Sequence, residues 1–147
     1  MGARACGSAR VDPRVTGGST ASQPMTVDPE LAEELESACR TTVGDRLRSV
    51  GYFTTEDHEV VYLREDLEFT GSVDAVVANE RLGFTSQDTY DDPELGPYRA
   101  TIRVFEHGYL TRIIVEDHGV FVTTDEMEIE RFLDLTEAVE SILMDHA

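Results

Sequence analysis

The sequence predicts an α+β fold, a five-stranded antiparallel sheet combined with three helices in the order α-β-β-α-β-β-β-α. Apolar residues recur at helical spacing in residues 28–50 and again in residues 126–144. Apolar and polar residues alternate through residues 98–123, as they do in strands that bury one face. A short sequence of one or two acidic residues followed by His-Gly interrupts this alternation twice, as two hairpin turns would.

The first helix is expected to begin after Asp28, which caps its amino end, with Pro29 at the first helical position. Its apolar stripe consists of Leu31, Leu35, Ala38, Cys39, Thr42, Val43, Leu47 and Val50. Gly51 is expected to end the helix, although Gly44 could split it. Because Cys39 lies on the apolar stripe and no cation is placed beside it, we expect a buried structural thiol.

The middle of the chain predicts a hairpin, a second helix and a long loop. Residues 52–54 and 58–63 are expected to form the two strands of the hairpin. The second helix is expected over residues 72–82 and to end at Gly83. Residues 84–97 then form a loop of about 14 residues, which is long for a compact domain.

Three strands and a closing helix complete the fold. The strands are expected over residues 98–106, 109–116 and 120–123. The last helix is expected over residues 126–144, with Asp125 as its cap and an acidic residue three positions further on.

The first 24 residues differ in composition from the rest of the chain. They contain three arginines, one acidic residue and no apolar period. We expect residues 1–24 to be either a disordered tail or upstream sequence translated in error, with Met25 as the true start. Residues 25–147 are then long enough for a single α+β domain with one core. Only Cys39 remains in that domain, so no intrachain disulfide is expected.

The chain is strongly acidic and contains no lysine. Its 147 residues include 30 acidic residues and 12 basic ones, all arginine, which gives a formal net charge of −18. Self-repulsion at this charge destabilises a compact state in dilute buffer, whereas in ~1 M salt the Debye length falls to about 3 Å and screens it. Acid-rich, lysine-free sequences resemble cytosolic proteins of halophilic archaea that accumulate salt, so a cytoplasmic location is expected. The same charge disfavours binding to nucleic acid, and no apolar run is long enough to cross a bilayer.

Two resemblances add to this prediction. The segments "CRTTVGDRLRSVGYF" and "YRATIRVFEHGYLTRIIVEDHGVFVTTD" look like a small uncharacterised haloarchaeal protein family, over most of residues 30–143. Across residues 28–144 the element order resembles roadblock/LC7 and profilin-like architectures, in which helices cover both faces of the sheet. The long loop at residues 84–97 departs from the usual short connection. The roadblock resemblance implies pairing through a helix or a sheet edge and engagement of GTPases.

The two His-Gly phrases are interpreted as turns. If His107-Gly108 and His118-Gly119 each form a two-residue turn, a strand of about eight residues separates them by roughly 25 Å. Zinc–nitrogen bonds are close to 2 Å, so a single ion cannot be held by both histidines of one protomer. A site shared between protomers, or one that pairs a turn with His58, stays open.

A turn at residues 107–108 also predicts the register of the hairpin. On the core face it places Val104 opposite Thr111, Ile102 opposite Ile113 and Ala100 opposite Val115. On the other face it places Phe105 opposite Leu110, Arg103 opposite Arg112 and Thr101 opposite Ile114, with Arg99 farther along.

Directly opposed arginines are unfavourable unless an anion lies between them. One interpretation is that carboxylates of the second helix, such as Asp74 or Glu80, or acids of the long loop satisfy them. The other is a ligand or partner site at Arg99, Arg103 and Arg112, because the planar guanidinium suits carboxylate and phosphate.

No sequence motif indicates a cofactor or a metal. The loop carboxylates lack the alternating ligands and the central glycine of an EF-hand, and they are Asp88, Asp91, Asp92 and Glu94. The chain also lacks a phosphate-binding glycine loop, a nucleophile elbow and zinc-type Cys/His spacing.

These observations favour a non-enzymatic interaction or regulatory module in a high-salt cytosol. Such a module acts through protein partners, with a homodimer expected. The alternative is a small-molecule sensor that binds an anionic ligand near Arg99, Arg103 and Arg112. A third hypothesis, an enzyme with His58 or His118 as acid or base, ranks last.

Overall fold

The computed structural model of the protein describes residues 3–4, 11–13, 27–67, 73–86 and 93–147. The described helices are α1 (Pro29–Val43), the 3-10 helix η1 (Gly44–Arg46), α2 (Val73–Arg81), α3 (Gly83–Ser86) and α4 (Ile129–Asp145). The described strands are β1 (Ala3–Arg4), β2 (Val11–Pro13), β3 (Leu47–Thr54), β4 (His58–Leu63), β5 (Ala100–Phe105), β6 (Gly108–Val115) and β7 (His118–Thr124). Most of the extension expected over residues 1–24 lies outside the described residues; β1 and β2 pair with each other there.

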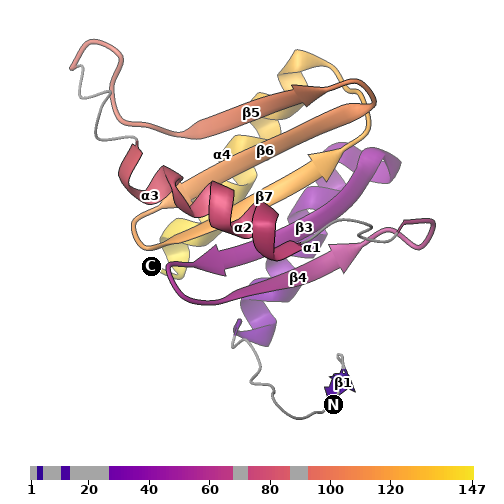
Figure 1. Ribbon diagram of the computed structural model, residues 1–147. Coiled ribbons are helices and arrows are strands. Elements are labelled where there is room, and N and C mark those ends of the chain that lie inside the picture. The colour runs from indigo at the N-terminus through magenta and orange to yellow at the C-terminus, as the bar shows by residue number, and fades with distance from the viewer. Residues whose placement is uncertain (1–2, 5–10, 14–26, 68–72, 87–92) are drawn as a thin grey trace.

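The five longer strands form one antiparallel sheet in the order β4-β3-β7-β6-β5. Figure 1 shows α1 and α4 behind this sheet and α2 with α3 in front of it. The predicted α+β fold, with the order α-β-β-α-β-β-β-α, is therefore confirmed, and η1 and α3 are short additions to it. Strands β4 and β5 are the two edges of the sheet.

Apolar side chains are buried on both faces of the sheet. The larger cluster joins the sheet to α1 and α4, with Leu35, Val50 and Leu143 among its fully buried members. The smaller cluster joins the sheet to α2 through Phe53, Leu110, Phe121 and Val77. Val77 is the one fully buried apolar residue that α2 adds to this smaller cluster, and Val73 and Val76 of the same helix pack against it while partly buried.

The first helix ends earlier than the sequence predicted. Gly44 has a φ of 62°, in the left-handed region that favours glycine, and its N–H donates to the carbonyl of Arg40. The helix therefore stops at Val43, and the predicted continuation to residue 50 is wrong. Leu47 and Val50, which fitted the helical stripe, are buried in β3 instead.

Both hairpin turns lie one residue earlier than predicted. Phe105 pairs with Gly108 and Val115 pairs with His118, so the two-residue turns are 106–107 and 116–117. The glycines lie inside strands at positions where a side chain would clash. A Cβ on Gly108 would overlap the carbonyl oxygen of Thr124, and one on Gly119 would lie 2.6 Å from the Phe53 ring. Close packing, and not a positive φ, is therefore the reason for both glycines.

Two other boundaries differ from the prediction. Gly83 begins the short α3 instead of ending the helical region, so residues 84–86 are helical and not loop. Helix α4 begins at Ile129, and Asp125 does not cap it, because its two carboxylate oxygens accept from Arg48 and Arg64. Residues 87–92 of the expected loop, with three of its four acids, lie outside the described residues. No helix in the described ranges is long and apolar enough to cross a membrane.

Candidate functional site

The structure keeps Arg103 and Arg112 on one face of the sheet, although they are not directly opposed. Arg103 pairs with Leu110 and Arg112 pairs with Thr101. The register therefore differs by two residues from the predicted one. Since side chains alternate with a period of two, a shift of two residues preserves the face of every side chain. The two arginines are diagonal neighbours on the face that α2 covers.

Glu80 of α2 lies between these two arginines. Its Oε2 accepts from Nε of Arg103 at 2.9 Å, and its Oε1 accepts from Nη1 of Arg112 at 3.1 Å. Glu80 is 2% exposed and Arg112 is 4% exposed, whereas Arg103 is partly open to solvent. A carboxylate of the second helix thus occupies the position between the guanidinium groups that an external anion would need.

The guanidinium of Arg112 is almost fully bonded within the protein. Its Nη2 donates to Thr101 Oγ1 at 2.8 Å, and its Nε donates to the Tyr98 hydroxyl at 3.3 Å. Its carbon also lies 5.8 Å from the centre of the Tyr98 ring. Gly83 leaves room for this group, because a Cβ there would lie 2.5 Å from the guanidinium carbon of Arg112.

Arg99 is not brought together with the other two arginines. It precedes β5, and its guanidinium binds Glu140 of α4, on the opposite side of the sheet from α2. Each of the three arginines has a carboxylate partner in the structure. The sensor hypothesis at Arg99, Arg103 and Arg112 stays a prediction.

His118 is a buried polar connection between the sheet and α4. Its Nε2 lies 3.0 Å from the carbonyl oxygen of Leu143, and its Nδ1 lies 3.0 Å from the hydroxyl of Tyr52. A carbonyl can only accept, so Nε2 carries the proton and Nδ1 accepts from Tyr52. Burial, together with the nearby Asp117, raises the pKa of Tyr52 and so favours the protonated donor.

The other sequence-predicted histidines lie apart from His118. His58 lies at the start of β4 and pairs with the exposed Asp74 at 3.2 Å. His107 is in the exposed β5–β6 turn, at the other end of β6 from His118. Among the described residues, no group of three or more His, Cys, Asp or Glu side chains could hold a metal ion.

Exposed apolar side chains gather at the β5 edge of the sheet. Five of the nine large exposed ones in the described part of the chain belong to β5 or to the first turns of α4, namely Ile102, Val104, Phe105, Ile129 and Leu133. Strand β5 lies near α4 through β6. Val104 of β5 pairs with Tyr109 of β6, and the ring of Tyr109 packs edge-on against that of Phe132 in α4, with 4.9 Å between the ring centroids. Ile102, Val104, Ile129 and Leu133 are called the β5–α4 surface below.

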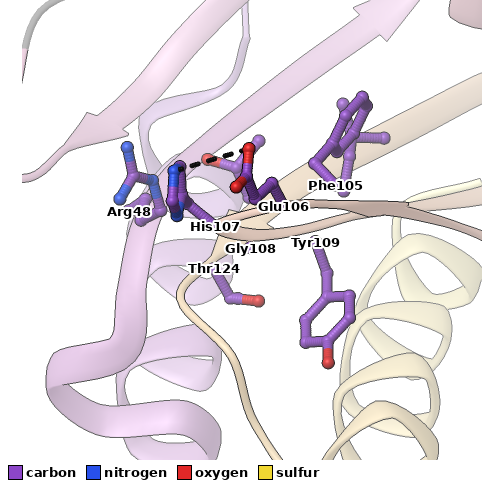
Figure 2. A pocket seen from close by; sticks show the side chains of 9 residues that line it. Arg48, Phe105, Glu106, His107, Gly108, Tyr109 and Thr124 are labelled. Carbon is purple, nitrogen blue, oxygen red and sulfur yellow. Dashed lines mark ion pairs between the residues drawn. The ribbon is translucent and has the colours of Figure 1, made fainter.

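A pocket of about 390 Å³ opens beside the β5–β6 hairpin. In Figure 2, Phe105, Glu106 and His107 lie on one side of the hairpin, with Arg48 of the separate strand β3 beside His107, while Tyr109 points to the other side. Leu110 and Thr123 also line the pocket, and its walls are mostly apolar. The sequence did not indicate this pocket, because its apolar pattern places Arg48 in a helix.

An ion network lies next to this pocket. Oδ1 of Asp125 accepts from Arg48 and its Oδ2 accepts from Arg64, both at 2.9 Å. The hydrogen bond from Arg64, followed by the one from Arg48, lowers the pKa of Asp125 against the opposing effect of burial. Arg64 also binds Asp66 and the carbonyl of Asp45. These contacts join the start of β3 and the end of β7 to the end of β4.

The arrangement of three helices around the sheet is that of the roadblock/LC7 fold class. The chain is similar to the gliding protein MglB from Thermus thermophilus, with 14% identity and a TM-score of 0.58 over 84% of this chain and 97% of the relative. A structure of MglB with a tetrameric arrangement gives the same identity and TM-score over 86% and 98% of the two chains. A roadblock/LC7 domain from Streptomyces avermitilis is 16% identical, with a TM-score of 0.53 over 76% and 94%.

At these identities the likeness shows the fold alone. The chain itself belongs to the family described as "Domain of unknown function (DUF7522)", which matches residues 33–144. No curated protein gives a significant match. The predicted membership of an uncharacterised family with roadblock-like topology is therefore confirmed, whereas the haloarchaeal origin stays a prediction.

Proposed function

We propose that the protein is a non-enzymatic interaction and regulatory module of a high-salt cytoplasm, which acts through protein partners that include a second copy of itself. The observation that carries this proposal is the β5–α4 surface, which lies at an edge of the sheet as the described strands form it. The roadblock/LC7 fold and the tetrameric arrangement of one structural relative support it.

The position of the β5–α4 surface suits association. Ile129 and Leu133 are four residues apart on α4, and Glu140 follows seven residues later on the same helical stripe. Since Glu140 binds Arg99 just before β5, this stripe runs along the edge strand. An apolar surface beside unpaired strand N–H and C=O groups is a template for another chain.

The side chains best suited to catalysis are already engaged in the structure. Burial raises the pKa of Cys39 to about 12, which makes its thiolate scarce near neutral pH. Both ring nitrogens of His118 are occupied by internal hydrogen bonds. These contacts support a role in binding over a role in chemistry.

The composition supports work at high salt. With 30 acidic residues and 12 arginines, two copies of this chain repel each other in dilute buffer. At molar KCl the screening length is about 3 Å, so the apolar contact is no longer opposed by long-range repulsion. We therefore expect both the fold and the self-association to weaken as KCl is removed. Circular dichroism that shows full folding at low salt would contradict the high-salt part of the proposal.

The test of self-association is light scattering coupled to size exclusion in molar KCl. The wild-type chain should elute as a dimer, and Val104→Asp should elute as a monomer, because the charge would be buried at the interface. Leu95→Asp is the matched control, since Leu95 is 77% exposed, close to the 74% of Val104, but precedes β5 and is not one of the residues of the β5–α4 surface. A monomeric wild type, or equal effects of the two substitutions, would refute the proposed interface.

A further inference from the structure

The pocket beside the β5–β6 hairpin has the size and the walls of a binding site. Its volume of about 390 Å³ lies within the roughly 300–1,000 Å³ that ligand pockets occupy. Phe105 and Leu110 supply apolar surface, and Gly108 and Thr123 are among the other residues that line the pocket. An apolar group that enters this space would leave water on several sides, which favours its binding.

Arg48 gives the pocket one well-placed positive charge. Its Nη1 donates to Asp125, but within the described residues its Nε and Nη2 donate no hydrogen bond. The side chain is 34% exposed, so part of the guanidinium lies against the protein, where charge interactions are stronger than in bulk water. A planar guanidinium with free donors is suited to a carboxylate.

The other two ionisable groups at the rim, Glu106 and His107, have little influence on a carboxylate bound at Arg48. Glu106 and His107 form a loose pair at 3.9 Å, and both side chains extend almost fully into solvent. Their charges are therefore well screened, above all at high salt. The polar preference of the pocket is set by Arg48.

We propose that this pocket binds an apolar group that ends in a carboxylate, with the apolar part against Phe105 and Leu110 and the carboxylate on Arg48. Two sources offer this chemistry: a small free acid, and the C-terminus of a polypeptide that ends in an apolar residue. Phe105 is the last residue of β5, so the pocket adjoins the β5–α4 surface, but none of the four residues of that surface lines it.

The test uses amide chemical shifts of the full-length, isotope-labelled chain in molar KCl. Hydrocinnamate should shift the amides of residues 105–110 in a saturable manner, and hydrocinnamyl alcohol, which lacks the charge, should bind more weakly. For the polypeptide source, a short peptide that ends in Leu-Phe is compared with the same peptide as its C-terminal amide. Tighter binding of the free-acid peptide than of hydrocinnamate assigns the site to a polypeptide C-terminus, and the reverse order assigns it to a small acid.

The contribution of Arg48 is isolated by a matched pair of variants. Arg48→Gln and Arg64→Gln each remove one of the two ion pairs of Asp125, but only Arg48 lines the pocket. Arg48→Gln should weaken hydrocinnamate binding about tenfold, the loss typical of a charged hydrogen bond, and should leave the alcohol unaffected. Arg64→Gln should change both affinities by less than about twofold.

Three results would overturn the proposal. The first is the absence of any saturable shift in the hairpin with either acid. The second is equal affinity for hydrocinnamate and its alcohol, which would remove the role of the carboxylate. The third is an equal loss in the two arginine variants, which would trace the effect to Asp125 and not to the pocket.

Discussion

Replacement of Glu80 by glutamine should destabilise the protein strongly, because it leaves a positive charge buried without a partner. The glutamine side chain keeps the shape of the glutamate but lacks the negative charge that lies between Arg103 and Arg112. Arg112 is 4% exposed, so water cannot take over the lost interaction. Arg103 is partly exposed, and its share is correspondingly smaller.

The expected cost is about 3 kcal/mol, the lower end of the roughly 3–5 kcal/mol for removing one member of a buried ion pair. The lower end applies because the amide oxygen of the introduced glutamine can still accept from one arginine. Such a loss is a large fraction of the ~5–15 kcal/mol by which domains are stable. With a urea m-value of about 1–3 kcal/mol/M, the unfolding midpoint should fall by about 1–3 M.

Urea unfolding in molar KCl, followed by circular dichroism, measures this effect. Glu140→Gln is the matched control, because it removes the same charge from a pair whose arginine, Arg99, is exposed and can be solvated, so it should cost no more than about 1 kcal/mol. The double variant Glu80→Leu, Arg112→Met should be more stable than Glu80→Gln, since it buries no unpaired charge. Equal losses in Glu80→Gln and Glu140→Gln would refute the reasoning.

Three further outcomes are expected. Arg64 and Arg48 hold the pKa of Asp125 below its usual range. Their ion pairs therefore contribute stability at pH values above the unfolded-state pKa of about 3.9, and this stability is lost as the pH falls through the lower folded-state pKa. Asp125→Asn should lose melting temperature less steeply than wild type below about pH 4, and an unchanged slope would contradict this. Iodoacetamide at neutral pH should label Cys39 only after unfolding, because burial raises its pKa to about 12; mass spectrometry of its peptide reads the rate, and equal labelling of folded and unfolded protein would be the contrary result. His118→Phe should cost about 2 kcal/mol and speed hydrogen exchange at the end of α4, since the Tyr52 hydroxyl loses its acceptor and the Leu143 carbonyl keeps only the His146 N–H as donor. Unaltered exchange there would show that the contact does not hold the helix.

Sequence alternation predicted which side chains share a face of the sheet, but not how far one strand slides along the next. A slip of one residue would have exposed the apolar core face, whereas a slip of two keeps every side chain on its face. Arg103 and Arg112 were therefore placed correctly on one face and wrongly in direct opposition. The observed register follows from the turn at residues 106–107, which pairs Phe105 with Gly108 and places Gly108 against the backbone of Thr124 in β7, a contact that alternation within one strand does not report.

An irregularity in β3 hid this strand from the sequence pattern. Leu47 and Val50 are three residues apart, which fits the stripe of α1 and not a regular strand, but the register of β3 shifts between Leu47 and Ser49 and both residues join one core cluster. The positive φ of Gly44 ends the helix, and pairing of β3 with β7 then determines the strand. The hairpin pocket was missed for the same reason, since Arg48 lies on the misassigned stretch. Arg99 was misplaced because alternation does not extend to a residue ahead of the strand.

The order of strands in the sheet has a consequence for how the chain folds. The β3–β4 hairpin and the β5-β6-β7 meander each contain only local pairings, and the sheet is completed where β3 meets β7. That junction joins residues far apart in sequence, since Arg48 and Asp125 are 77 positions from one another. Closing a loop of this length lowers the chain entropy before the contact between the two strands stabilises the fold, so such topologies fold slowly. We expect the search for this one junction, and not the formation of any helix or hairpin, to limit the folding rate.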